Sequence, residues 1–455
     1  MASAKTGTRA GDAGERSPGL SYQELLDTDT KPVPDVLRLE SPADISPNRV
    51  PRKQYTSQAF HDLEVEKVWK KTWQMACREE EIPEVGDHQV YDVASLSILV
   101  VRVAEDEIRG FHNVCLHRSR KIKAHAGRSE MLRCPFHGWT WNLDGSLREI
   151  PCAWDFPHVN AEDYGLPAVQ VGTWGGFVFV NPDLEAESLE DYLGELPAHF
   201  ERWPLEKRYK AVHVARVLPC NWKVAQEAFM EAYHVLSTHP QLLAGIGDAN
   251  SQYDVWGNVS RAITPNGTPS PHLDWEPSEQ DLLDALTNRY LDEDPAMVLP
   301  EAMTGRQLLG QASRVQLAPL VPGAFELTDA ELLDSFYYTV FPNFHPWGAY
   351  NRITYRFRPH GNDPHHCIME VMYLNPYRGK KPPPCEIHWL GPDEDFTNAP
   401  ELGFLGRVFN QDAFNLGAVQ AGLRAGVHEN LVFSNYQETK IRHWHRLLDQ
   451  HIEAE

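Results

Sequence analysis

Two cysteines and two histidines, grouped in two short motifs, are the residues whose types and spacing best predict chemistry in this chain. They are Cys115, His117, Cys134 and His137. Two thiolates and two imidazoles can hold a [2Fe–2S] cluster, with both sulfur ligands on one iron and both nitrogen ligands on the other. This mixed ligation raises the reduction potential well above that of an all-cysteine cluster. The two motifs therefore predict electron transfer.

A structural zinc site is the alternative, because two cysteines and two histidines also bind Zn²⁺ in a tetrahedron. Zinc fingers usually group cysteine with cysteine and histidine with histidine. Here each motif contains one residue of each type. This distribution favours a cluster held between two loops, in which each loop gives one ligand to each iron.

The residues beside the four ligands carry a family resemblance. Arg118 follows the first histidine, and the run Pro-Phe-His-Gly-Trp over residues 135–139 surrounds the second. In both features the chain resembles the Rieske family of [2Fe–2S] proteins. One difference is visible, because Ser119 stands where many members of that family have glycine.

A second set of possible metal ligands follows the run Asn-Trp-Lys at residues 221–223, where we expect a helix. Glu231 and His234 are three residues apart and would share one face of a helix. His234 and His239 are five residues apart, which would separate them by about 140° around an unbroken helix. Pro240 disfavours helix at the residue before it, so a bend there can bring both rings to one ion. The alternative is an ordinary amphipathic helix with surface histidines.

Two imidazoles and one carboxylate form the triad that binds non-heme Fe(II) and leaves coordination positions open. The two sets of ligands together resemble the catalytic (alpha) subunit of the Rieske non-heme iron oxygenases, the aromatic ring-hydroxylating oxygenase family. Residues 221–240, NWKVAQEAFMEAYHVLSTHP, are similar to the mononuclear-iron motif of that family. The resemblance implies that His234 and His239 bind iron. It also favours Asp412, on a predicted C-terminal helix, as the third ligand, with Glu401 as the alternative.

The resemblance also gives Glu231 a catalytic role. In the family, an acid at this position lies between the iron of one subunit and the Rieske histidine of its neighbour, and it carries electron transfer. Most ring-dihydroxylating members have aspartate there, whereas glutamate occurs in some monooxygenase branches, including enzymes that act on quaternary amines. Glu231 therefore favours a monooxygenase over a cis-dihydroxylating dioxygenase. The alternative from another class is a non-catalytic Rieske electron carrier or a zinc-binding protein.

The implied activity is that of an O2-dependent terminal oxygenase. Electrons from NAD(P)H would reach the cluster through a reductase, and possibly a ferredoxin, and then pass to Fe(II). The resemblance implies a head-to-tail homotrimer, possibly with a small beta subunit, because within one chain of this family the two metal sites are too far apart for fast electron transfer. Heterologous contacts of this kind close into rings. The expected substrate is small and hydrophobic, aromatic or polycyclic, and is hydroxylated or oxidatively dealkylated. Its apolar pocket walls are predicted to include Met230, Val235, Phe341, Phe344 and Trp347.

The pattern of segments predicts an α+β fold. We expect a disordered leader and an N-terminal segment that packs on the catalytic domain (1–47), an all-β Rieske domain (48–175) and a catalytic domain (176–455). Alternating residues predict strands over 87–114 and again over 336–377. The resemblance implies a helix-grip arrangement, a curved antiparallel sheet covered by helices. Residues 240–335 are polar and poorly periodic, so we expect loops and short helices there.

Composition excludes several classes of protein. The 455 residues are 42% hydrophobic, and no apolar run approaches the length of a membrane span. A net charge of −22 disfavours nucleic acid and anionic membranes as partners. Seven scattered cysteines do not form a disulfide pattern. Since residues 1–20 contain no apolar stretch typical of a secretory signal, we expect a cytoplasmic location.

Overall fold

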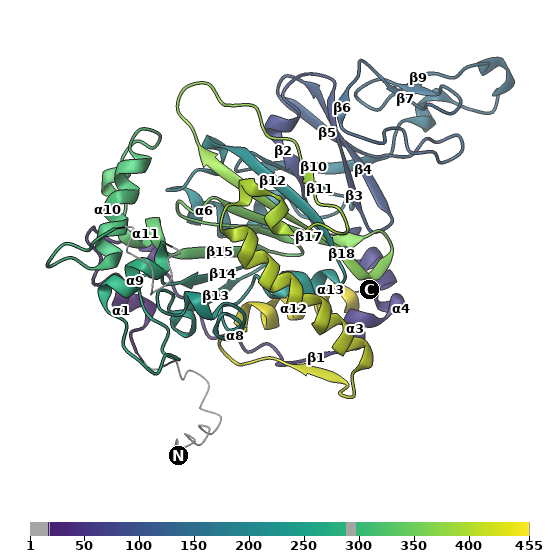
Figure 1. Cartoon of the computed structure of the whole chain (residues 1–455). Helices are drawn as coiled ribbons and strands as arrows, with labels where there is room; N and C mark the ends of the chain where they lie inside the picture. The colour runs from purple at the N-terminus through teal and green to yellow at the C-terminus, as the bar shows by residue number, and fades with distance from the viewer. Residues whose placement is uncertain (1–16, 18, 288–296, 455) are drawn as a thin grey trace.

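A computed structural model describes residues 17, 19–287 and 297–454 of the chain. The expected leader falls mostly on residues 1–16, which lie outside the described residues. Two large sheets organise the molecule, and each belongs to one domain (Figure 1). None of the helices in the described ranges is long and apolar enough to cross a bilayer.

The first domain is built on a seven-stranded sheet in the order β2-β11-β10-β5-β4-β3-β6. Its strands are β2 (Gln74–Arg78), β3 (Asp87–Val93), β4 (Leu96–Ala104), β5 (Glu107–His112), β6 (Gly127–Arg128), β10 (Ala168–Trp174) and β11 (Phe177–Asn181). A small sheet of β7 (Leu132–Arg133), β8 (Thr140–Trp141) and β9 (Leu147–Glu149) extends from it at the upper right of Figure 1. The predicted strands over 87–114 are therefore confirmed.

Strand β4 is buried between two hydrophobic cores. Ile98 and Val100 pack into the large core shared with the second domain, whereas Leu99 and Val101 pack into the core beneath the cluster motifs. Successive side chains of a strand point to opposite faces. The apolar run over residues 98–101 thus buries the middle of β4 on both sides.

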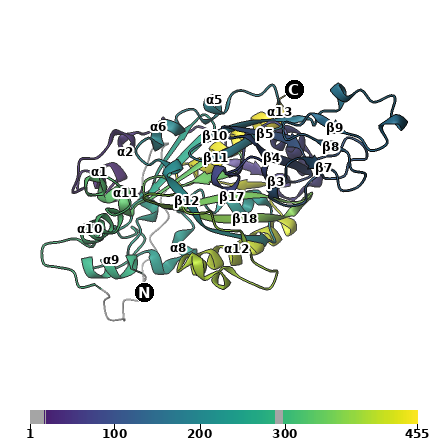
Figure 2. The same ribbon diagram turned by 90° about the horizontal axis from the view of Figure 1, so that it is seen from above.

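The second domain contains an eight-stranded sheet in the order β13-β14-β15-β16-β17-β18-β12-β19. Its strands are β12 (Arg208–Leu218), β13 (Gln252–Trp256), β14 (Val259–Thr264), β15 (Ser335–Val340), β16 (Phe344–Pro346), β17 (Ile353–His360), β18 (Asp363–Pro376) and β19 (His388–Trp389). All strand pairs of the two large sheets are antiparallel except β12 with β19, which is parallel. The helices α7 (Trp222–Glu227), α12 (Leu405–Ala425) and α13 (Thr439–Glu453) pack on this sheet. The short helix α8 (Val235–Thr238) lies beside α12 (Figure 2). The expected α+β class, with an antiparallel sheet covered by helices, is confirmed.

Residues 240–335 supply β13 and β14 to this sheet and then form a helical cap at the left of Figure 1. It contains α9 (Glu279–Leu286), α10 (Gly305–Leu317) and α11 (Asp329–Leu333). Each helix begins at a capping box, in which the N-cap hydroxyl and the third helical side chain satisfy each other's backbone. The prediction of short helices and loops is confirmed for the other described residues of this segment, but it is wrong for 252–264, which form β13 and β14.

The N-terminal helices pack against both domains. They are α1 (Tyr22–Leu26), α2 (Asp35–Arg38), α3 (Lys53–Thr56) and α4 (Gln58–Glu64). The Tyr22 hydroxyl donates to Asp334 in the second domain at 3.0 Å. Two further short helices, α5 (Leu189–Leu193) and α6 (Leu196–Phe200), connect the domains.

The predicted limits of the first domain, 48 and 175, differ at both ends from the extent of its sheet. Strand β1 (Arg49–Pro51) pairs with β20 (Asn430–Val432) near the C-terminus, and not with the first sheet. Strand β11 pairs with β10, with Trp174 opposite Phe177, so a boundary at 176 would divide a hairpin. The first sheet therefore runs from β2 to β11.

A buried charge cluster joins the two domains. Glu370 accepts from Arg356 through both carboxylate oxygens at 2.7 Å and from Arg358 at 3.1 Å. Arg356 also donates to the carbonyl of Ala76 in β2, and Arg358 to the carbonyl of Asp92 in β3. Burial alone would raise the pKa of Glu370, but the two guanidinium charges hold that pKa well below its usual range. One carboxylate thus pairs with two cations that hold the first domain.

The substitution Glu370→Gln is expected to lower the free energy of unfolding by about 3–5 kcal/mol, because it leaves buried charge uncompensated. The control Glu66→Gln, in a surface pair with Lys70, should change it by less than about 1 kcal/mol. Since the native pKa of Glu370 is depressed, its contribution is present above the ordinary glutamate pKa of 4.5 and is lost as the pH falls through the native value. Urea denaturation from pH 7 down to pH 3 should show the deficit shrinking; a constant deficit would contradict this.

Candidate metal centres

The two cysteine motifs form turns with the same hydrogen bond. The backbone N–H of Ser119 donates to the carbonyl of Cys115, and that of Gly138 to the carbonyl of Cys134, both at 3.0 Å. Ser119 has φ 58° and Gly138 has φ 80°, so both adopt the left-handed conformation. Glycine adopts this conformation without strain, whereas serine does so at a cost. The substitution at 119 therefore leaves the turn unchanged.

The four side chains are arranged for two metal ions. Cys115 and Cys134 are buried beneath the loops, and the rings of His117 and His137 lie 4.5 Å apart, nearer the surface. Nδ1 of His117 is buried with no hydrogen-bond partner in the described part of the chain. Buried polar atoms are normally bonded, so a metal bond accounts for this nitrogen.

The positions of these ligand atoms disfavour a single zinc ion. Among the described residues, no three of the four bring their ligand atoms within 4.8 Å of one another. A tetrahedral zinc site would bring all four that close. The separation of the cysteine pair from the histidine pair fits a two-iron cluster instead.

The second predicted set converges on one point. Atom Oδ1 of Asp412, on α12, lies 2.9 Å from Nε2 of His239 and 3.6 Å from Nε2 of His234. No other group of three or more possible ligands this close occurs in the described residues. The alternative ligand, Glu401, accepts a hydrogen bond from His388 at 2.6 Å and does not belong to this group.

The helix expected through this segment is interrupted. Helix α7 ends before Glu231, and α8 starts after His234. The N–H of Ala232 donates to the Tyr253 hydroxyl at 3.0 Å, and the N–H of His234 donates to the Glu231 side chain at 2.9 Å. These tertiary and side-chain bonds replace the helical ones. Glu231 and His234 therefore meet through a turn and not along a helix face.

The far nitrogen of each imidazole is held by an acceptor. Nδ1 of His234 donates to Glu231 at 2.7 Å, and Nδ1 of His239 donates to the Gln411 side-chain oxygen at 2.9 Å. With Nδ1 protonated, each neutral ring presents a lone pair at Nε2. A lone pair facing a carboxylate oxygen requires a proton or a cation between them. The arrangement thus fits a bound metal ion.

The charge at this site points the same way. Burial alone would lower the pKa of His234, but the carboxylates of Glu231 and Asp412 outweigh it and raise the pKa to about 9. The site therefore stabilises positive charge between these residues. A divalent metal can supply that charge in place of the proton.

A cavity of about 570 Å³ opens beside the triad. Its aromatic lining residues are Phe229, Tyr337, Trp347, Tyr350, Tyr355, Phe404 and Phe409. Of the predicted pocket residues, Val235 and Trp347 line it. A cavity of this size and composition suits a small organic ligand.

Three predicted pocket residues do not line this cavity. Phe344 lies on the other face of the sheet, with its ring 4.8 Å from that of Phe177 in the first domain. Phe341 stacks on His451 of α13 at 5.1 Å, and Met230 is fully buried in the core. The lining residues Tyr337 and Tyr355 were missed because alternation along a strand does not reveal which face of the sheet meets the cavity.

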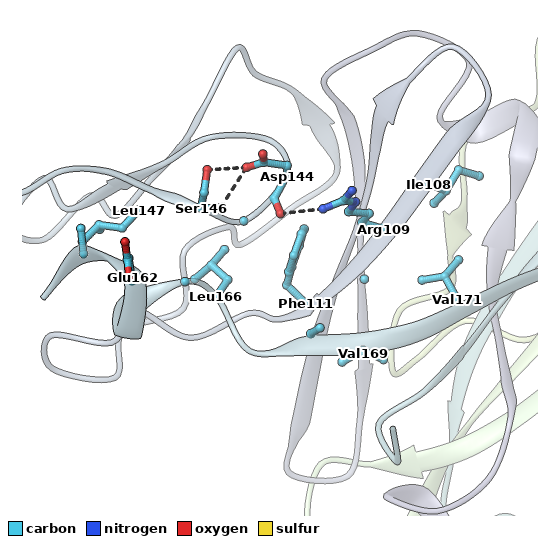
Figure 3. A pocket seen from close by; sticks show the side chains of 15 residues that line it. Ile108, Arg109, Phe111, Asp144, Ser146, Leu147, Glu162, Leu166, Val169 and Val171 are labelled. Atoms are coloured by element: carbon cyan, nitrogen blue, oxygen red, sulfur yellow. Dashed lines mark hydrogen bonds between the residues drawn. The ribbon is translucent and has the colours of Figure 1, made fainter. Parts of the chain in front are cut away.

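A larger cavity of about 680 Å³ lies in the first domain between β5, β10 and the turn after β8 (Figure 3). Its floor is apolar, with Phe111 and Val169 among the lining residues. Its arginine, Arg109, donates to the backbone of Asp144 at 3.3 Å. No cysteine or histidine is among the residues that line it. This cavity offers no redox or metal chemistry.

Comparisons with known proteins agree with the fold and with both centres. The family model described as "Ring hydroxylating alpha subunit (catalytic domain)" matches residues 197–454, and the model "Rieske [2Fe-2S] domain" matches residues 72–160. The chain therefore belongs to the ring-hydroxylating alpha subunits with a Rieske domain. The cofactors of this family are a Rieske [2Fe–2S] cluster and a mononuclear non-heme iron.

Relatives within the family carry both monooxygenase and dioxygenase names. The chain is 31% identical over 229 residues to the glycine betaine monooxygenase oxygenase subunit of Pseudomonas aeruginosa, covering 49% of this chain and 51% of that protein. It is 32% identical over 209 residues to the biphenyl 2,3-dioxygenase alpha subunit of Rhodococcus jostii, covering 44% and 45%. The chain thus spans about half the length of the curated relatives it matches.

Solved structures share the fold over most of the chain. A quaternary ammonium Rieske monooxygenase superimposes with a TM-score of 0.64 at 18% identity, covering 89% of this chain and 95% of that one. Naphthalene 1,2-dioxygenase gives a TM-score of 0.63 at 18% identity, covering 89% and 92%.

Gln411 is predicted to position His239 for metal binding. Gln411→Leu removes the acceptor at Nδ1 and is expected to lower the affinity for Fe(II) by about 10–100-fold. Gln411→Glu keeps an acceptor and should retain most of the affinity. Anaerobic titration against a competing chelator measures both, with the cluster absorbance as a check that the fold is intact. Equal affinity of the leucine variant and the wild type would disprove this role.

Proposed function

We propose that this chain is a terminal oxygenase that inserts oxygen from O2 into a small hydrophobic organic substrate, using electrons supplied by a reductase, directly or through a ferredoxin. The observation that carries the proposal is the triad of His234, His239 and Asp412 beside an aromatic cavity. The same chain carries the two cysteine and histidine loops of a Rieske domain.

Each part of the site has a separate task in this proposal. Cys115, His117, Cys134 and His137 would hold the [2Fe–2S] cluster, and the triad would hold Fe(II). When bound, these centres supply electrons and activate oxygen. Glu231 and Gln411 fix the imidazole tautomers, so that Nε2 of each ring faces the metal position. The aromatic walls hold the substrate and keep water from the reacting atoms.

We propose monooxygenation as the reaction type. Glu231 supports it, because the resemblance associates glutamate at this position with monooxygenase branches. The match to a glycine betaine monooxygenase subunit also supports it. The second candidate is cis-dihydroxylation, which the match to a biphenyl dioxygenase subunit favours.

Turnover under ¹⁸O2 separates these two reactions. We expect one labelled oxygen atom in the product, with the second atom released as water. Mass spectrometry of the product measures the number of labels. Two labelled hydroxyl groups on one product molecule would make the protein a dioxygenase.

A head-to-tail homotrimer completes this proposal. The cluster loops beside β7–β9 and the helix α8 lie in well separated parts of the molecule in both Figure 1 and Figure 2. Large apolar side chains are exposed beside each centre, with Trp154 81% exposed near the cluster loops and Phe414 81% exposed on α12. Exposed apolar surface marks contact sites, so we infer that these two faces meet in neighbouring subunits. The cytoplasmic location stays a prediction.

Asp412→Ala tests the metal assignments. The wild type should contain about three irons per chain and no stoichiometric zinc. Asp412→Ala should contain about two irons and keep the low-temperature EPR signal of the reduced cluster. Metal analysis by mass spectrometry measures both. A zinc-containing, colourless wild type would refute the proposal.

The same variant tests whether electrons cross between subunits. Asp412→Ala chains keep a cluster, and Cys134→Ala chains keep the triad, so each should be inactive alone. Co-assembled, they should recover part of the O2 uptake that a screened substrate stimulates in the wild type. A co-assembled trimer as inactive as its parents would disprove transfer between subunits.

A further inference from the structure

Among the described residues, the cavity beside the triad is lined by one charged group outside the metal centre. Its acidic and histidine lining residues, Glu231, His234, His239 and Asp412, all belong to the triad and its hydrogen bonds. The remaining charge is the guanidinium of Arg352. No carboxylate of the described residues lies within 4.0 Å of this guanidinium.

The Arg352 guanidinium lies on the cavity face of the sheet. Arg352 directly precedes β17, and the next residue, Ile353, pairs with Tyr373 of β18. Directly opposed residues of an antiparallel pair share one face, and Ile353 lines the cavity. The guanidinium lies 5.1 Å from the centre of the Tyr373 ring. Since Arg352 itself is exposed, its charge lies at the mouth of the cavity.

A second polar group of the lining also lacks a partner. The indole N–H of Trp347 is buried and makes no hydrogen bond within the described residues. Its ring is fixed between Tyr337 at 5.6 Å and Tyr355 at 6.0 Å. An indole N–H can only donate. Leaving such a donor unsatisfied costs free energy unless a ligand accepts from it.

These observations define a polarity along the cavity. A bound divalent metal offsets the charges of Glu231 and Asp412 at the inner end, whereas the charge of Arg352 at the mouth has no acid partner among the described residues. A negative group on a ligand is therefore attracted to the mouth. The net charge of −22 disfavours anions over the surface as a whole. The cavity mouth is therefore a local exception to the charge of the protein.

From this polarity we propose that the cavity selects a ring-containing organic carboxylate. The carboxylate binds Arg352 at the mouth, a hydrogen-bond acceptor near the ring system takes the Trp347 N–H, and the apolar end points to the triad. The inference names the substrate class of the proposed oxygenase and rests on that function for the reaction, but binding is a separate property. Two donors facing one ligand would fix which end reaches the triad.

The test compares two ligands of nearly equal shape, 2-naphthoate and the neutral 2-naphthamide. Calorimetric titration of the metal-loaded protein should show at least about tenfold tighter binding of the carboxylate, the effect of a charge-assisted hydrogen bond. Arg352→Met should abolish this preference and leave 2-naphthamide binding unchanged. Arg407→Met is the matched control, because Arg407 is an exposed arginine on α12 that does not line the cavity; it should alter neither ligand.

A second variant addresses the indole. Trp347→Phe keeps an aromatic ring and removes only the N–H. It should weaken 6-hydroxy-2-naphthoate, which has an acceptor oxygen on its ring, by about tenfold and leave 2-naphthoate, whose oxygens all belong to the carboxylate, unchanged. Repeating the titrations after removal of the mononuclear metal should preserve the carboxylate preference. A preference that disappears with the metal would mean that the carboxylate binds iron, which would overturn the proposal.

Other results have equally definite meanings. Equal affinity for the two ligands, no binding of either at millimolar concentration, or an Arg352→Met variant that still prefers the carboxylate would each overturn the inference. A protein that shows the preference but contains no iron would retain the binding site and refute the oxygenase. An iron-containing protein that consumes O2 without the preference would do the reverse.

Discussion

The structure depends on bringing one carboxylate to two imidazoles across a long stretch of chain. Asp412 lies 173 positions after His239 and still approaches it to 2.9 Å. His234, His239 and Asp412 are buried or partly buried, and burying such polar groups costs free energy unless they are paired. The sheet, α12 and the turn between α7 and α8 all act to hold this pairing. The cavity is the space left between those elements.

The two domains are held together by a different interaction, the buried charge cluster around Glu370. Apolar contacts such as Phe177 with Phe344 supply burial but little direction, whereas the Glu370 cluster fixes which backbone groups meet. The arginines reach into the backbone of β2 and β3, so the first domain is held by directional bonds. Because the first domain is held in this way, the loops that carry the cysteine and histidine ligands have one orientation toward a neighbouring molecule.

The sequence predicted the local features well and the long-range ones less well. The turns at Cys115 and Cys134 are encoded within a few residues, and Pro240 ends α8 as expected, because these effects are local. Asp412 required a family resemblance, since no local pattern connects it to residue 239. Phe344 was misplaced because the face that a strand residue takes depends on register. The helix break at Glu231 escaped because Tyr253, from another strand, supplies the competing hydrogen bond.

Gln411 and Asp412 are consecutive residues of one helix, and they contact opposite sides of the same imidazole. Each residue turns an α-helix by about 100°. A single-residue insertion or deletion early in α12 would therefore rotate both Asp412 and Gln411 away from His239. Neither contact would survive such a change. Length changes in this family member should accumulate outside α12, while its side chains remain free to vary on the solvent face.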